Sequence, residues 1–147
     1  MRPVLSVTSE CAPLVKTGGL ADVAGALPAA LASYGWDMRT LLPGYPAVMA
    51  ALKRPKTVTA FEALFGGSAR VLAGKAAGLN VLVLDAPHLY DRPGTLYLDA
   101  DGNDFADNPQ RFAALSQAAA AIAKGAVKSW VPEVVQCHDW QAGLTPY

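Results

Sequence analysis

The sequence predicts an α/β domain built on a parallel sheet, because a strand, a helix and a second strand follow one another at its start. Residues 4–7 form a short apolar run that is typical of a buried strand. Apolar residues then recur at helical spacing over residues 19–34, and Gly35 is the expected C-cap. Residues 37–42 form the second strand. This order of elements is the unit from which parallel sheets are built.

The middle of the chain adds one strong strand and two weaker ones. Residues 79–85 carry the most continuous run of β-forming residues. Residues 57–61 and 69–72 alternate weakly, so we expect either edge strands or a hairpin around Gly66 and Gly67. In either case these two segments belong at the edge of the sheet, and an edge hairpin is one of the two arrangements left open.

The last third predicts a loop, a helix and a final strand. Residues 86–107 lack periodicity and are rich in Pro, Gly, Asp and Asn, which indicates a functional loop. Asn108 is the expected N-cap of the next helix, with Pro109 at its first position. Residues 133–136 form a further strand, and residues 141–147 the beginning of another helix. The long helix should present one apolar face made of Phe112, Leu115, Ala119, Ile122, Ala126 and Trp130.

Composition narrows the class of protein. Hydrophobic residues make up 52% of the 147 residues and charged residues 16%, which is typical of a globular chain. Twelve basic residues balance twelve acidic ones and form no cluster, so neither nucleic acid nor an acidic membrane surface is an expected partner. No segment is long and apolar enough for a bilayer or a signal peptide, and we expect a cytoplasmic protein with Cys11 and Cys137 as reduced thiols.

A glycine pair stands after the first strand, in the sequence Lys16-Thr-Gly-Gly19. Glycines let a ligand approach the backbone, and the first N–H groups of a helix favour an anion. Lys16 adds a mobile positive charge. The spacing matches neither GxGxxG nor the Walker A pattern. On local chemistry alone, an anion site and a tight turn with a surface lysine are both open.

His138 and Asp139 follow the final strand. In an open parallel sheet, ligands bind at the carboxyl ends of the strands, so these residues should meet the glycine turn there. The alternative for His138 is a packed or solvated side chain. We expect Cys137 to be buried at the strand end and Trp140 to pack under the loop, and nothing indicates a nucleophilic role for the thiol.

Four acidic residues in the loop invite a comparison with a calcium site. Asp99-Ala-Asp-Gly-Asn-Asp104 has the start of an EF-hand loop, but the twelfth position is Gln110 and the flanking helices are missing. We therefore expect a solvated polar loop and no metal site.

Several motifs, in order, resemble the start of bacterial glycogen synthases and plant starch synthases. They are Ser9-Glu-Cys-Ala-Pro-Leu-Val-Lys-Thr-Gly-Gly-Leu-Ala-Asp-Val23, Gly25-Ala-Leu-Pro28, Leu42-Pro-Gly-Tyr-Pro46, Asp107-Asn108 with Arg111-Phe112, and Cys137-His-Asp-Trp-Gln-Ala-Gly143. The resemblance extends from Val4 to the last residue. It implies a Rossmann-like, parallel-sheet N-terminal domain of the GT-B arrangement, in which two such domains face each other across a cleft.

The resemblance also implies a reaction. Family members transfer glucose from ADP-glucose, or in some cases UDP-glucose, to the non-reducing end of an α-1,4-glucan, with retention and without a metal or other cofactor. Lys16 is implied to contact the donor phosphate, and Gly18 and Gly19 to pack against the diphosphate and sugar. Asp22 is implied to hold that loop.

The sugar side of the site is implied by three other positions. His138 resembles the histidine beside the reacting carbon and is the expected catalytic residue, with Asp139 beside it as a further substrate-binding residue. Tyr97 lies in the loop where the family places a tyrosine near the glucose.

Length sets this chain apart from the family. We expect residues 1–147 to form an incomplete first domain, without the C-terminal nucleotide-binding domain, and to be inactive alone. The apolar surface that other elements would cover should favour self-association. Two further readings stay open: a non-catalytic glucan- or partner-binding module, and a phosphate or nucleotide-sugar sensor.

Overall fold

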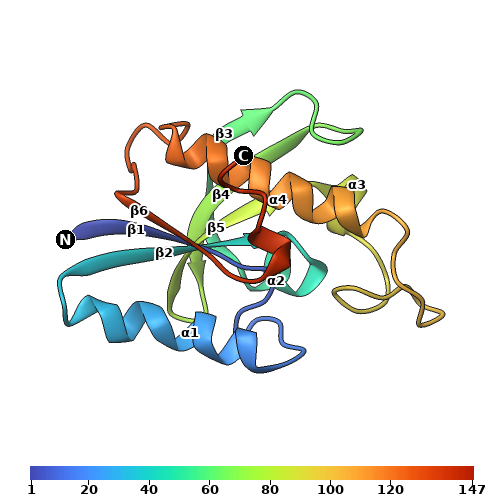
Figure 1. Ribbon diagram of the computed structural model, residues 1–147, viewed down its shortest axis with the longest axis horizontal. Coiled ribbons are helices and arrows are strands. Elements are labelled where there is room, and N and C mark those ends of the chain that lie inside the picture. Colours follow the sequence, from blue (N-terminus) through green and yellow to red (C-terminus); the bar gives the residue numbers. More distant parts are fainter.

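The computed structural model describes all 147 residues as a six-stranded sheet with helices on both faces (Figure 1). The strands are β1 (Arg2–Val7), β2 (Trp36–Pro43), β3 (Lys53–Phe61), β4 (Ala69–Ala76), β5 (Leu79–Asp85) and β6 (Val134–Cys137). The helices are α1 (Gly19–Ala32), α2 (Pro46–Ala51), α3 (Pro87–Tyr90) and α4 (Asn108–Ala123), followed by the 3₁₀ turn η1 (Trp140–Ala142).

The sheet has the strand order β3-β4-β5-β2-β1-β6. Strands β5, β2, β1 and β6 are parallel, whereas β3 pairs antiparallel with β4, and β4 with β5. The predicted α/β class is therefore confirmed, and the two weak strands form the expected antiparallel hairpin at the edge of the sheet. The carboxyl ends of β1 and β6 lie side by side, with Val7 opposite Cys137.

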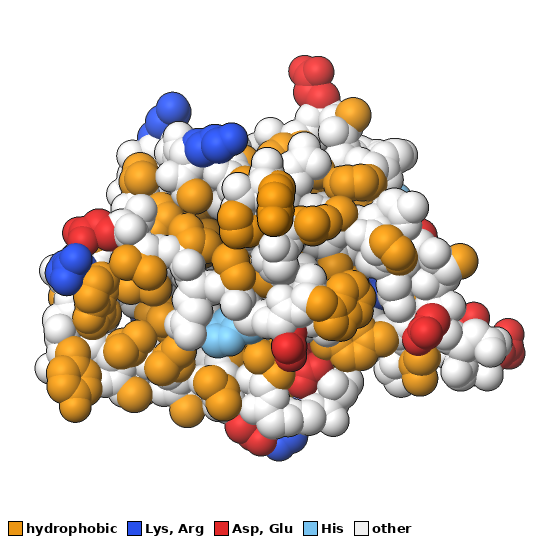
Figure 2. Space-filling model, in the orientation of Figure 1, with side chains coloured by type: hydrophobic (Ala, Val, Ile, Leu, Met, Phe, Trp, Pro, Cys, Tyr) orange, Lys and Arg blue, Asp and Glu red, His pale blue; other side chains and the backbone are white.

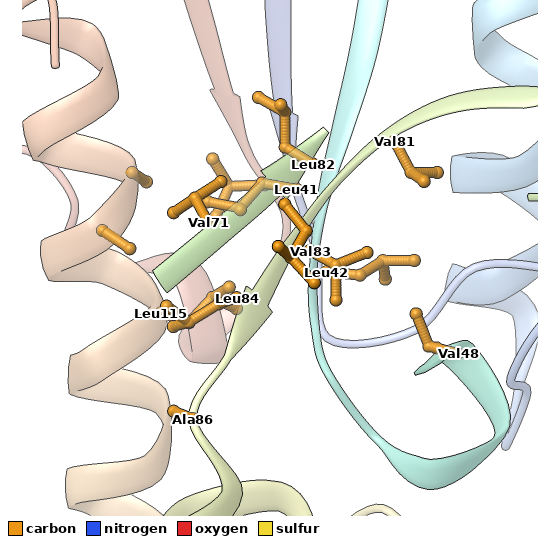
Figure 3. Packing of buried hydrophobic residues seen from close by; sticks show 14 of the residues in the cluster. Leu41, Leu42, Val48, Val71, Val81, Leu82, Val83, Leu84, Ala86 and Leu115 are labelled. Carbon is orange, nitrogen blue, oxygen red and sulfur yellow. The ribbon is translucent and has the colours of Figure 1, made fainter. Parts of the chain in front are cut away.

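The core lies on both faces of β2 and β5. These central strands carry fully buried Leu41, Leu42, Val83 and Leu84. Figure 3 shows Leu84 next to Leu115 of α4, with Val81 and Val48 on the opposite side of the sheet. Both faces of a parallel strand are covered in this way, which is why residues 79–85 are almost continuously apolar.

Two helix boundaries differ from the sequence prediction. Helix α1 ends at Ala32 with Ser33 as its C-cap, and Gly35 lies beyond it in a turn at φ +83°. Asp107 is the residue that flanks α4, and Asn108 is its first helical residue. The Asn108 side chain is committed elsewhere, because its amide donates to the Tyr97 carbonyl and its oxygen accepts from Arg111.

The C-terminal part differs more. Gly125 adopts φ +90° directly after the C-cap of α4, so Ala126 and Trp130 lie outside the predicted helix. Trp130 is still buried, and its indole N–H donates to Asp37. Residues 141–147 form only η1 and turns, and Pro146 cannot extend a helix. The short helices α2 and α3 were not predicted, because four to six residues show no helical period.

Apolar side chains are exposed along β6 and the segment after it. Figure 2 shows hydrophobic side chains spread over the face seen in Figure 1, with lysines and arginines towards its edges. The exposed ones on or near β6 are Val131, Val134, Trp140 and Leu144. No helix has the length and apolar character needed to cross a membrane.

Candidate functional site

The glycine turn is held by the carboxylate of Glu10, a residue that is only 2% exposed. One oxygen, Oε1, accepts the backbone N–H groups of Thr17 (3.3 Å) and Gly18 (3.1 Å). The other, Oε2, accepts the hydroxyls of Thr17 (2.5 Å) and Tyr97 (2.8 Å). Four donors from two distant parts of the chain thus converge on one carboxylate.

This environment favours the charged form of Glu10. Burial alone would raise the pKa of its carboxyl, but the hydrogen bonds from Thr17, Tyr97 and Gly18 outweigh that cost and the pKa is lowered. A charged acceptor makes such hydrogen bonds stronger than neutral ones. Glu10 therefore fixes the position of the turn before any ligand arrives.

Lys16 pairs with Asp22 across the turn. Its Nζ donates to both carboxylate oxygens, at 2.8 Å and 2.7 Å. Both side chains are about half exposed, so the pair contributes little to stability and can rearrange at small cost. The structure thus brings together two residues that the sequence placed in one motif, with the lysine ammonium free to move toward an incoming anion.

The glycine pair opens to empty space. A Cβ atom added at Gly18 or Gly19 would meet nothing within 4 Å, and neither residue has a positive φ. The backbone N–H groups of Gly19 and Leu20 donate to no acceptor in the chain. The start of α1 therefore offers free donors on an unobstructed surface, as an anion site requires.

His138 is placed beside β1 and is almost fully buried. Its Nε2 lies 3.1 Å from the Ser6 hydroxyl, and its backbone N–H donates to Val7. Burial lowers the pKa of the ring, and the nearby Asp139 carboxylate opposes that shift only in part. The lowered pKa favours the neutral imidazole at pH 7, and 9% of the residue is exposed.

Asp139 has an exposed side chain and a backbone conformation that few residue types adopt readily. Its φ of +61° and ψ of −173° lie in a region that costs a non-glycine residue about 1–3 kcal/mol. Such strain is concentrated at functional sites. The charge of this carboxylate also helps to raise the pKa of Tyr97.

Tyr97 connects the loop to both parts of the site. Its hydroxyl donates to Glu10 and therefore accepts the proton of Ser9, 2.7 Å away. Burial, with the charge of Glu10, raises the pKa of Tyr97 to about 12. Its ring packs against Phe112, which meets Trp140 edge to face with ring centroids 5.4 Å apart. Tyr97 therefore contacts the carboxylate that holds the glycine turn, and it is linked to Trp140 through Phe112.

Two expectations for the end of β6 are wrong. Cys137 is exposed because β6 is an edge strand, with no element covering that position. Trp140 is 61% exposed rather than packed under the loop, although its ring meets Phe112 edge to face.

The acidic loop is a turn. Oδ1 of Asp99 accepts the backbone N–H groups of Asp101 and Asn103, so this carboxylate closes the loop on itself. No group of three or more His, Cys, Asp or Glu side chains is placed to hold a metal ion.

Glu10 is the functional residue that sequence reasoning missed. A lone carboxylate has no recognisable spacing, so no sequence pattern marks this residue. The available signal is its position, since it is an acidic residue three positions after the end of a buried strand, at the ligand-binding edge of the sheet.

Comparisons with known proteins agree on one family. A family model described as the starch synthase catalytic domain matches residues 3–147. The chain is 61% identical over 146 residues to a glycogen synthase of Paracoccus denitrificans (strain Pd 1222), covering 99% of this chain and 31% of that protein. It is also 61% identical over 142 residues to a glycogen synthase of Rhodopseudomonas palustris (strain BisB18), covering 97% of this chain and 29% of that protein.

A solved structure has the same fold. It is the catalytic domain of starch synthase IV from Arabidopsis thaliana, bound to ADP and acarbose, with a TM-score of 0.75 and 26% sequence identity. The match covers 98% of this chain and 29% of that chain. The chain thus spans about 30% of the length of the curated relatives named above.

Proposed function

The chain belongs to the family of starch synthase catalytic domains, and from this premise we propose that it forms part of a retaining glucosyltransferase. The proposed reaction moves glucose from ADP-glucose to the non-reducing end of an α-1,4-glucan. Support comes from the high identity to glycogen synthases over almost the whole chain. ADP-glucose is preferred over UDP-glucose as the proposed donor because the similar starch synthase IV structure holds ADP.

The observation that carries the proposal is the open glycine pair beside Lys16. A leaving diphosphate develops negative charge, and catalysis requires donors that are already in place to receive it. The N–H groups of Gly19 and Leu20 are without acceptors, and Lys16 can exchange Asp22 for a phosphate oxygen. Asp22 then holds the lysine near the turn when no donor is bound.

The sugar is proposed to lie on the side of β6. His138 would line the glucose pocket with the edge of a neutral ring, which can hydrogen-bond a sugar hydroxyl without adding charge. The exposed Asp139 carboxylate and the Tyr97 hydroxyl are further partners for sugar hydroxyls. Ser6 acts as a positioning residue by fixing the His138 ring.

Residues 1–147 are proposed to be the first of two Rossmann-like domains, with nucleotide contacts supplied by a second. On this proposal the chain alone transfers no glucose. Its exposed Val131, Val134 and Leu144 should also favour self-association, because such side chains lose water-exposed area when two copies meet. Sedimentation of the chain at rising concentration tests this, and a monomer at every concentration would contradict it.

The reaction is tested by replacing the matched segment of the Paracoccus denitrificans glycogen synthase with residues 1–147, a protein called here the swapped synthase. We expect it to transfer glucose to a glucan from ADP-glucose faster than from UDP-glucose, with retention at the anomeric carbon observed by NMR. A folded swapped synthase without transfer, beside an active parent enzyme, would contradict the proposal.

Lys16→Ala in the swapped synthase tests the phosphate contact. We expect kcat/KM for ADP-glucose to fall about tenfold or more, which corresponds to a loss of about 1.4 kcal/mol in transition-state stabilisation. Lys128→Ala is the matched control, because Lys128 is an exposed lysine outside the site. Equal kinetics for the two variants would remove the phosphate role of Lys16.

A further inference from the structure

A cavity of about 520 Å³ lies beside the glycine turn, and Lys16 is the one residue of the proposed donor site that lines it. It is formed where the carboxyl ends of β2 and β5 lead into α2 and α3, and Val15, Lys16 and Thr17 form one of its sides. Cavities of this size hold small organic molecules. Its walls combine apolar rings with polar groups, as ligand sites do.

The charge of the cavity is one-sided. Lys16, Arg92 and Arg111 line it, and no acidic side chain does. Lys16 is paired with Asp22 and Arg92 with Asp107, both outside the cavity wall. Arg111 has no carboxylate partner, and its guanidinium lies instead over the rings of Tyr90, Phe105 and Phe112.

Arg111 is the group that marks this cavity as a site. The side chain is only 1% exposed. Its Nε donates to the Leu89 carbonyl, and Nη1 donates to the Leu96 carbonyl and the Asn108 side chain. Nη2 donates to no atom of the chain. A buried cation without a counter-ion is costly, and an anion in the cavity would offset that cost.

We propose that this cavity binds a phosphate monoester, with the phosphate against Arg111 and the organic part against the apolar wall. A guanidinium with free N–H groups suits phosphate oxygens. The Thr95 hydroxyl lines the same cavity and accepts two backbone N–H groups, which leaves its own proton for a phosphate oxygen. Tyr45, Tyr90 and Leu96 supply the apolar wall.

The site is separate from the proposed donor site, although Lys16 belongs to both. Gly18, Gly19, His138 and Asp139 do not line the cavity. Its ligand would therefore bind whether or not the chain takes part in glucose transfer. The two proposals can fail independently, because one is measured by binding to this chain and the other by turnover of the swapped synthase.

The test uses phenyl phosphate as the probe and benzyl alcohol as its neutral counterpart, each titrated into the ¹⁵N-labelled chain. We expect saturable shifts of the backbone signals of Ala47, Gly94 and Thr95 with phenyl phosphate and none with benzyl alcohol. No saturation, or shifts confined to the turn at Gly18 and Gly19, would overturn the proposal; the second result would leave the donor site intact.

Two variants on one helix show whether the cavity itself is occupied. Ala47 and Ala50 are both exposed residues of α2, and only Ala47 lines the cavity. Ala47→Phe should fill it and weaken phenyl phosphate binding by about tenfold or more, whereas Ala50→Phe should leave binding unchanged. Equal affinities of the two variants would overturn the proposal.

Arg111→Lys tests the role of the guanidinium. The variant keeps the charge but loses the planar set of donors, so weaker binding is expected. Circular dichroism checks that it is folded, and if it is not, the pair of alanine variants decides. A folded Arg111→Lys chain that binds as tightly as the wild type would contradict the contact with Nη2.

Discussion

The glycine pair at the start of α1 differs from the glycine in the second turn of that helix. At Gly25, in the second turn of α1, an added Cβ would lie 2.3 Å from the carbonyl oxygen of Ala12. At Gly18 and Gly19, where the helix starts, an added Cβ would meet nothing. Packing within the chain thus explains Gly25, but no contact or backbone angle of the chain explains the pair.

The difference separates structure from function along one helix. Residue 25 sets how closely α1 lies on the loop that precedes it, which fixes the direction of the helix start. Residues 18 and 19 leave that start uncovered. An uncovered helix start with free N–H donors suits a diphosphate, and this is the physical case for the proposed donor site at the turn.

Gly25→Ala should have the largest effect on stability. The new methyl overlaps a backbone oxygen that cannot rotate away, so α1 must shift, and overpacking of this kind costs about 1–3 kcal/mol or more. Chemical denaturation of the chain measures it. A variant as stable as the wild type would show that α1 is not seated on Ala12, and the contrast between the two glycine positions would be lost.

Glu10→Gln should have the next largest effect. The amide keeps the shape of the side chain but replaces one acceptor by a donor, and buried groups left unpaired cost about 1–3 kcal/mol. The turn should also loosen, so amide hydrogen exchange at Thr17 and Gly18 should become faster. Unchanged exchange there would show that the turn does not depend on the carboxylate.

The pH dependence supplies a control for Glu10. Its pKa is lower in the folded chain than the ordinary 4.5, so its contribution is present above about pH 4.5 and is lost as the pH falls through the folded value. The Glu10→Gln variant should lack this part of the loss of folding stability at acid pH. Parallel stability curves for wild type and variant at acid pH would contradict the assignment.

His138 gives the smallest of these effects. Because burial lowers the pKa of its ring, the unfolded chain takes up its proton first, so stability should fall as the pH drops below 6.5. An NMR titration of the ring proton signals follows this group directly. A midpoint at or above 6.5 would contradict the buried position beside Ser6.

Much of the fold could be predicted because strong local patterns coincide with single elements. The continuous apolar run of β5 predicts a buried strand, and the alternation in β3 and β4, although weaker, predicts strands at the edge of the sheet. The ends of the helices could not be predicted as well, because they depend on the backbone angles at Ser33 and Gly125. The spacing of apolar residues in the sequence does not show these angles. The exposure of Cys137 depends on β6 being an edge strand, which only the assembled sheet decides.

The parts of the site that lie close together in the sequence could be predicted, whereas contacts between distant segments could not. Lys16 and Asp22 share one motif, and the structure places them in contact. The bond between Glu10 and Tyr97 joins residues 87 positions apart, so no local pattern contains it. The cavity next to Arg111 depends in the same way on segments brought together by the sheet.

The central claim is that the open glycine pair receives the donor diphosphate, and its most direct test is the KM for ADP-glucose of the swapped synthase carrying Gly18→Ala and Gly19→Ala together. We predict a rise of about tenfold or more, without a loss of stability, because neither methyl meets the chain and alanine restricts the unfolded chain more than glycine does. A KM equal to that of the unmodified swapped synthase would contradict the account.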